Sequence, residues 1–127
     1  MSFPRCVGCT KISLNNFRLN KKRLNDISEG DKDFERELIQ LYQEACTEKL
    51  PFLEEALEKG HPDNSVLYSH DIKGSSSNIG AEAVRKISER MEQLCRQNRF
   101  QEAFEMLPEL RQELTLTYQA FDQYLQE

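Results

Sequence analysis

Apolar residues recur at intervals of three and four along most of the chain, which is the period of an amphipathic helix, and strand-like alternation is absent. The first long stretch runs from Asp31 to Lys59, with Asp31 as the expected N-cap and Gly60 as the stop. Pro51 lies inside it and is expected to bend the helix. The buried stripe is predicted to consist of Phe34, Leu38, Leu41, Ala45, Phe52 and Ala56.

Two further helical stretches follow in the second half of the chain. Between Gly80 and Asn98 the predicted stripe is Val84, Ile87, Met91, Leu94 and Cys95. From Ala103 to the C-terminus it is Ala103, Leu107, Leu110, Leu114, Tyr118, Phe121 and Leu125. Pro108 is expected to kink or restart this last helix.

The segment from His61 to Ile79 opens with Pro62, and Asp63 and Asn64 are candidates for its N-cap. Within it, residues 74–78 are a glycine, three serines and an asparagine, which together cost roughly 3 kcal/mol relative to alanine in a helix, so a loop is the plain alternative. Helical projection nevertheless gathers the apolar residues on one face, which favours a helix. That face consists of Ser65, Tyr68, Ile72, Ser76 and Ile79.

A shorter stretch, residues 20–28, carries Leu24 and Ile27 three positions apart and suits a small helix in front of the others. Residues 1–19 are expected to form an irregular leader. Four amphipathic helices with short connections bury their stripes only against one another. The predicted fold class is therefore all-α, an antiparallel up-and-down four-helix bundle over residues 20–127 with a short extra N-terminal helix.

Length and charge narrow the range of functions. The chain of 127 residues is the size of one domain, and its net charge of -5 has the wrong sign for binding nucleic acid or an anionic membrane. No apolar run approaches the roughly 18 residues that cross a bilayer, and the first residues lack the apolar core of a secretory signal. We therefore expect a cytoplasmic protein with free thiols.

On the helix predicted for residues 61–79, His70 faces away from the core. Its neighbours on that face are Val66, Leu67, Lys73, Gly74 and Ser77. An exposed imidazole keeps a neutral, nucleophilic nitrogen at cytosolic pH. Gly74 and Ser77 leave room for a partner to approach, and Lys73 is placed to neutralise phosphoryl oxygens. The pattern indicates a histidine suited to carrying phosphate, with Val66 and Leu67 either an apolar foothold for a partner or plain solvent-facing residues.

Residues 70–80, HDIKGSSSNIG, resemble the signature of histidine-containing phosphotransfer (HPt) domains. The shared features are the histidine, the aliphatic residue two positions on, the Lys-Gly-Ser that follows and the closing Ile-Gly. Ser69 fits the small residue before the histidine, whereas Tyr68 stands where the family more often has leucine. The resemblance extends over about residues 20–127.

The resemblance implies a relay intermediate. His70 would accept a phosphoryl group at Nε2 from the aspartate of one receiver domain and pass it to the aspartate of another, with Lys73 assisting and Gly74 keeping the approach open. The implied partners are receiver domains of response regulators and of hybrid histidine kinases, and the implied form is a monomer. The alternative is a phosphate-independent helical adaptor that docks the same partners.

The remaining expectations concern absences. Scattered glycines give no phosphate-binding loop, so we expect a carrier without its own ATP site rather than an enzyme, and no cofactor. We expect no metal, because the segment offers no cluster of carboxylates around His70. An autonomous phosphohistidine phosphatase or kinase is disfavoured, because no second acid, base or nucleotide loop is expected to accompany His70. Any magnesium would belong to the receiver.

Other candidate residues have plainer explanations. Cys6 and Cys9 have half of a zinc-site spacing, and Cys46 and Cys95 are expected to fill the core. His61 is expected in a turn. The basic string at residues 21–23 is interpreted as solvated charge, although it would also steer an acidic receiver. A solvated surface is expected for Asp33, Glu35, Glu37, Glu54, Glu55 and Glu58.

Overall fold

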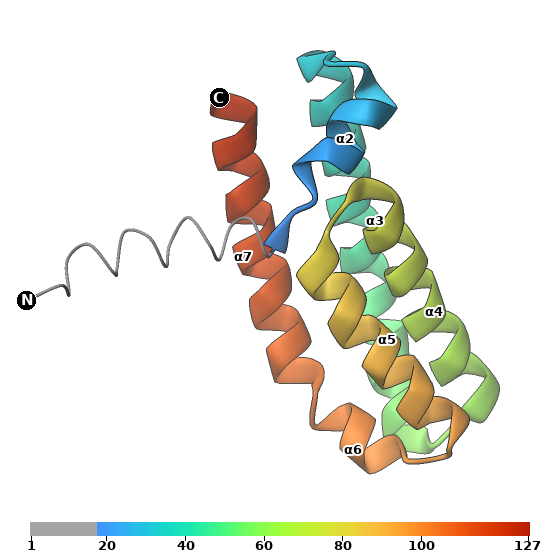
Figure 1. Cartoon of the computed structure of the whole chain (residues 1–127). Coiled ribbons are helices and arrows are strands. Elements are labelled where there is room, and N and C mark those ends of the chain that lie inside the picture. The colour runs from blue at the N-terminus through green and yellow to red at the C-terminus, as the bar shows by residue number, and fades with distance from the viewer. Residues whose placement is uncertain (1–17) are drawn as a thin grey trace, which may run out of the picture.

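The computed structural model describes residues 18–127, which fold into an up-and-down bundle (Figure 1). Its four long helices are α3 (Lys32–Lys59), α4 (Pro62–Ile79), α5 (Glu82–Arg96) and α7 (Leu107–Gln126). The short α2 (Lys21–Ser28) covers one end, and α6 (Phe100–Phe104) joins α5 to α7 at the other. The predicted four-helix bundle with a short extra N-terminal helix is confirmed.

Helix ends follow local chemistry. Asp31 caps α3 by accepting hydrogen bonds from the backbone N–H groups of Asp33 and Phe34, at 3.0 and 3.2 Å, and Gly60 ends the helix at a φ of 66°. The caps predicted for α4 are wrong, because the helix begins at Pro62 and its N-cap is His61, which makes no side-chain cap hydrogen bond. Proline at the first helical position has a helical φ and lacks the N–H that would otherwise need a partner.

The prolines inside the long stretches have different outcomes. Helix α3 runs unbroken through Pro51. Before Pro108 the chain turns between α6 and α7, and Pro108 itself lies in the first turn of α7. The predicted restart is thus confirmed.

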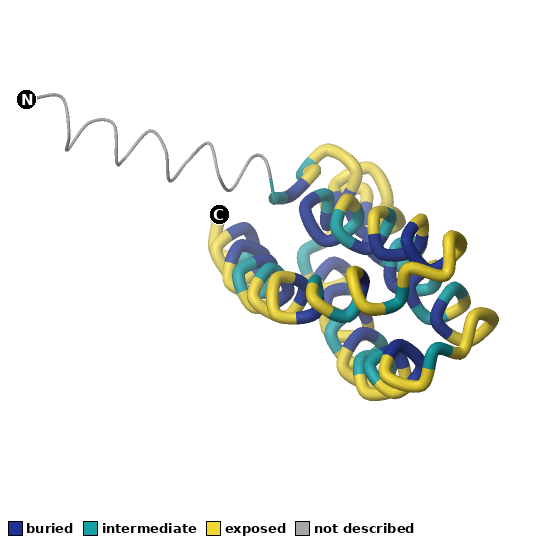
Figure 2. Tube along the Cα trace, turned by 90° about the horizontal axis from the view of Figure 1, so that it is seen from below, coloured by how far each residue is buried: buried dark blue, intermediate teal, exposed yellow. Residues whose placement is uncertain are grey.

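Burial on α5 and α7 follows the predicted stripes. In Figure 2, buried and exposed stretches alternate along the coils of the helices. Three members of the predicted stripes, Ile87, Tyr118 and Leu125, are half-buried and pack against the core rather than lying inside it. The others are buried. Buried too are Ala83, Ser88, Glu92, Thr117, Ala120 and Tyr124, which the stripes did not include.

The buried face of α3 lies mostly one position beyond the predicted one. Phe34, Leu41 and Phe52 are 40%, 61% and 50% exposed. The core side consists of Glu35, Ile39, Tyr42, Cys46, Leu53, Ala56 and Leu57. Most predicted positions are followed by another residue suited to burial, so the chain carries two adjacent stripes, and periodicity alone does not choose between them.

The prediction that Glu35 lies on a solvated surface is wrong. It is fully buried, and its Oε2 accepts hydrogen bonds from Ser28 Oγ at 2.6 Å and from Tyr124 Oη at 2.8 Å. Burying a carboxylate is costly unless hydrogen bonds replace water. Glu35 therefore ties α2 and α7 to the first turn of α3.

The described chain begins against the α4–α5 turn. Leu19 is buried and forms an isolated antiparallel bridge with Ala81, and the Asn20 N–H donates to the Gly80 carbonyl at 2.7 Å. Residues 1–17 lie outside the described residues, so the boundary at residue 20 stays a prediction. Within residues 18–127, none of the helices combines the length and apolarity needed to span a membrane.

Candidate functional site

Helix α4 forms despite its run of poor helix formers, and the serines on its buried face have hydrogen-bond partners. Ser69 Oγ donates to the Ser65 carbonyl at 2.7 Å, and Ser76 Oγ lies 2.7 Å from Tyr42 Oη on α3. Both hydroxyls are buried, and each bond offsets the loss of water. Tertiary packing thus overrides local propensity, as the helical interpretation requires.

The inner face of α4 is made of small and aliphatic side chains. Ser65, Ser69, Ile72, Ser76 and Ile79 are buried, and α4 packs most extensively against α5. Tyr68 departs from the prediction, since it is half-buried and its ring stacks on exposed Phe52 with centroids 5.7 Å apart. Small residues let α4 and α5 approach closely, so a side chain on α5 reaches across to the outer edge of α4.

That side chain is Glu92. His70 is exposed as predicted, with 56% of its side chain accessible, and its Nδ1 lies 3.1 Å from Glu92 Oε2. The expectation that no acidic group accompanies the histidine is therefore wrong. The sequence did carry a signal for this contact, because Glu92 follows Met91 in the apolar stripe of α5. In the structure Glu92 is buried with that stripe. A charged residue in a buried stripe indicates a specific partner.

Two cations hold the Glu92 carboxylate. Lys73 Nζ lies 2.8 Å from Oε1, and Arg96 approaches Oε2 with Nη2 at 2.7 Å and Nε at 3.2 Å. Burial alone would raise the pKa of Glu92, but its contacts with Lys73, Arg96 and His70 outweigh burial and lower the pKa to about 2. Glu92 is therefore ionised at neutral pH.

The ionised carboxylate decides which ring nitrogen of His70 carries the proton. A carboxylate only accepts hydrogen bonds, so Nδ1 must be the donor across the 3.1 Å contact. In the neutral ring the lone pair then lies on Nε2, and 56% of the His70 side chain is exposed. The nucleophilic nitrogen thus follows from the hydrogen bonding of the other one.

The helix face beside His70 is open. A Cβ added at Gly74 would have no heavy atom within 4 Å beyond its own stretch of helix, and Ser77 is exposed. Lys73 is 26% exposed, so its ammonium is anchored on Glu92 yet remains accessible from solvent. The structure therefore brings His70, Lys73, Gly74 and Ser77 onto one face.

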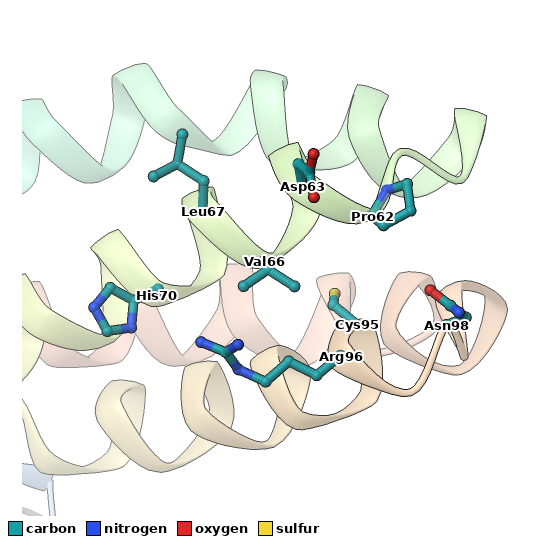
Figure 3. Close-up of a pocket in the computed structure, with 8 residues that line it drawn as sticks. All are labelled: Pro62, Asp63, Val66, Leu67, His70, Cys95, Arg96 and Asn98. Carbon is teal, nitrogen blue, oxygen red and sulfur yellow. The ribbon is translucent and has the colours of Figure 1, made fainter.

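An open pocket of about 530 Å³ adjoins the imidazole between α4 and α5. It is lined by Pro62, Asp63, Val66, Leu67, His70, Cys95, Arg96 and Asn98. Figure 3 shows the Arg96 side chain extending along α5 toward the His70 ring. Leu67 is 49% exposed, whereas Val66 is half-buried and packs against the core, so of the two predicted foothold residues only Leu67 is fully solvent-facing.

The remaining candidates have the plainer roles. His61 is an exposed N-cap residue, and Cys46 and Cys95 are buried free thiols, as predicted. Burial raises the pKa of the Cys46 thiol to about 11, so it stays protonated and unreactive. Cys6 and Cys9 lie outside the described residues.

The structure brings together an exposed imidazole on a bundle helix and a carboxylate that accepts a hydrogen bond from its Nδ1, an arrangement suited to a histidine phosphotransfer module. The sequence profile of the Hpt domain matches residues 37–120, so the chain belongs to the Hpt domain family, whose members act in two-component signalling. Among solved structures, histidine-containing phosphotransfer protein B (HptB) from Pseudomonas aeruginosa PAO1 is similar, with a TM-score of 0.77, 25% identity, and coverage of 86% of this chain and 95% of that one.

A curated relative is also similar in sequence. The phosphorelay intermediate protein rdeA of Dictyostelium discoideum is 44% identical over 91 residues, which is 72% of this chain and 36% of rdeA. The chain thus matches little more than a third of that protein's length.

Proposed function

We propose that this chain is a phosphorelay intermediate that carries a phosphoryl group on Nε2 of His70, accepting it from the aspartate of one receiver domain and passing it to the aspartate of another. The observation that carries the proposal is the 3.1 Å contact between His70 Nδ1 and ionised Glu92, which leaves Nε2 free on an open helix face. The names of rdeA and HptB support the same function.

The transfer step needs little machinery from the chain itself. The Nε2 lone pair attacks phosphorus, the bond from phosphorus to the aspartate oxygen breaks, and its electron pair returns to the carboxylate. Nδ1 keeps its proton, so the phosphorylated ring is cationic. Positioning and charge neutralisation dominate such a loose transition state, and Lys73 supplies a cation beside the path.

Receiver domains are the proposed partners, and the surface around His70 is the proposed contact. Leu67 offers exposed apolar area, and Val66 is one of the residues that line the adjoining pocket. Ser77 has a small side chain, which leaves space for the receiver beside His70. An acidic receiver site complements Lys73 and Arg96. We propose that the chain acts as a monomer and that response regulators and hybrid histidine kinases supply the receivers.

We further propose a carrier without an ATP site of its own, working in the cytoplasm. Its scattered glycines and the absence of a phosphate-binding loop in the sequence support the first point. The free thiols of Cys46 and Cys95 support the second, because a reducing compartment keeps cysteines unpaired.

The test is phosphate transfer from a receiver domain phosphorylated on its aspartate. The wild type should gain acid-labile, base-stable phosphate, and His70→Gln should gain none. The sequence contains two histidines, so His61→Gln is the matched control and should be labelled like the wild type. Label retained in His70→Gln would contradict the proposal. Binding of the receiver with no label on the wild type would favour the phosphate-independent adaptor.

A further inference from the structure

Glu92 contacts the ring nitrogen that does not react, and its charge bears on the phosphorylated state as well as the free one. We propose that Glu92 keeps the proton on Nδ1 of His70 while Nε2 carries the phosphoryl group, and so keeps that group transferable. Glu92 is in this view a positioning residue, acting through His70 rather than on phosphorus. The inference rests on the proposed relay function and deepens it.

The rate of transfer from phosphorylated His70 depends on how readily the imidazole leaves phosphorus. When the phosphorylated ring retains the Nδ1 proton, the Nε2–phosphorus bond breaks with its electron pair returning to Nε2, and a neutral imidazole leaves. The phosphoryl group forms a new bond to the receiver's aspartate oxygen. If Nδ1 has lost its proton, the departing group is an imidazolate anion, which is a much stronger base and a far poorer leaving group. Only the protonated ring hands the phosphoryl group on efficiently.

The geometry places a buried negative charge against that proton. Oε2 of Glu92 lies 3.1 Å from Nδ1; the Glu92 side chain is only 6% exposed and that of His70 is 56% exposed, so water screens the contact from the His70 side alone. Attraction between a carboxylate and an imidazolium favours the protonated ring. A hydrogen bond from Nδ1 to an uncharged acceptor lacks that charge term.

The other charges around the ring determine how much of this attraction survives. On α4, Lys73 contacts Glu92, while Asp71 pairs with Lys49 of α3 at 3.7 Å. On α5, Arg96 contacts Glu92, and the Cys95 thiol is neutral because burial raises its pKa. Glu89, one turn earlier, pairs with Arg85.

Lys73 and Arg96 partly neutralise Glu92 in the free protein. A doubly charged phosphoryl group on Nε2 competes for these same two cations. The side chain of Arg96 is 60% exposed, and its guanidinium holds Glu92 in the unphosphorylated protein. As the two cations shift toward the phosphoryl group, they neutralise less of the Glu92 charge. The attraction between Glu92 and the protonated ring is therefore stronger in the phosphorylated protein than in the free one.

The test is a pH titration of the phosphorylated protein. Wild type and Glu92→Gln are phosphorylated with phosphoramidate, and loss of the Nδ1 proton is followed through ³¹P and ¹⁵N chemical shifts. Glutamine keeps the shape and removes the charge. We expect the midpoint for loss of the Nδ1 proton to fall by about one pH unit or more in Glu92→Gln. Glu89→Gln, the same substitution on the same helix away from His70, should titrate like the wild type.

A second variant covers the case in which Glu92→Gln does not fold. Arg96→Gln removes an exposed cation that competes for Glu92, so its midpoint should rise rather than fall. A purely structural role for this cluster would move neither midpoint. Equal midpoints in wild type and Arg96→Gln, or in wild type and a folded Glu92→Gln, would overturn the inference.

The rate of transfer to a receiver separates this inference from the relay function. Glu92→Gln should donate as fast as the wild type at low pH and about tenfold more slowly above its own lowered midpoint, matching a one-unit shift. A wild type that exchanges phosphate with receivers while Glu92→Gln shows the same pH profile would overturn the role of Glu92 alone. A wild type that exchanges none would overturn the proposed function.

Discussion

Lys73 and His70 are held by opposite oxygens of one carboxylate: Lys73 Nζ lies 2.8 Å from Oε1 of Glu92, and His70 Nδ1 lies 3.1 Å from Oε2. The Lys73 ammonium is thus fixed relative to the imidazole ring by a single buried side chain. Replacing Lys73 therefore removes a charge from the transfer path and loosens its geometry at once.

Lys73→Ala should slow phosphoryl transfer by about tenfold or more, because a positioned cation on the transferring group is lost. Stability should fall by only about 1 kcal/mol, since Arg96 still pairs with Glu92. Lys49→Ala is the matched control, because the side chain of Lys49 is 29% exposed, close to the 26% of Lys73, and pairs with Asp71 rather than Glu92. Transfer kinetics and urea unfolding measure the two effects, and an unchanged transfer rate in Lys73→Ala would refute its role.

Acid should weaken the fold partly through Glu92. Its pKa in the folded protein is about 2, below the ordinary 4.5, so between these values the unfolded chain binds more protons than the folded one. The stability that Glu92 contributes is therefore complete above about pH 4.5 and lost as the pH falls through about 2. We expect about 2 kcal/mol, less than the full pKa difference implies, because the heads of Arg96 and His70 are solvated.

Urea unfolding of wild type and Glu92→Gln at pH 6 and near pH 2 measures this contribution. The wild type should be the more stable at pH 6, and the gap should close as the pH approaches 2. A gap that stays constant would contradict the assignment, because other carboxylates titrate alike in both proteins.

Substitutions at Gly74 should affect the stability of the fold and the rate of phosphoryl transfer in different directions. No group outside its own stretch of helix lies within 4 Å of an added Cβ, so Gly74→Ala should stabilise the fold by about 0.5 to 1 kcal/mol through helix propensity. Gly74→Leu should keep the helix yet cut transfer by at least about tenfold, because the side chain stands where the receiver approaches. Circular dichroism and transfer kinetics test both, and full-speed transfer by Gly74→Leu would show that clearance is not needed.

Gly80 is required by close packing rather than by function. Its φ is 83°, and an added Cβ would lie 2.6 Å from the Asn20 carbonyl oxygen. Gly80→Ala should destabilise the protein by about 3 kcal/mol, combining left-handed strain with a backbone clash. Gly30 has the same φ and no atom closer than 3.8 Å, so Gly30→Ala should cost only about 1 kcal/mol. Equal losses measured by thermal unfolding would contradict the clash.

The sequence is sufficient for the four long helices, the short N-terminal helix, their order and most of their boundaries, because caps and breaks are local. The separate short helix α6 was not predicted. Asp31 and Gly60 end α3 by bonds and backbone angles formed within a few residues. The same holds for the exposure of His70, which follows from the apolar residues on the far side of α4. These features depend on periodicity and on neighbours in the chain.

Contacts between helices cannot be predicted from periodicity and neighbouring residues alone. Leu38 and Ile39 are equally apolar neighbours, and the choice of Ile39 for the core depends on how α3 meets the rest of the bundle. Glu35 is buried only because Ser28 and Tyr124, 7 and 89 residues away, supply hydrogen bonds. Glu92 likewise meets His70 across 22 residues of sequence, through the close approach of α4 and α5.

The most direct measurement of the central claim is the position of the phosphorus atom after transfer. The ¹⁵N-labelled chain is phosphorylated by a receiver domain, and phosphorus–nitrogen couplings are recorded in the histidine side chains. We predict coupling to Nε2 of His70 and to neither nitrogen of His61, with a proton still on Nδ1 of His70. Phosphorus attached to Nδ1 of His70, or to any other residue, would contradict the account.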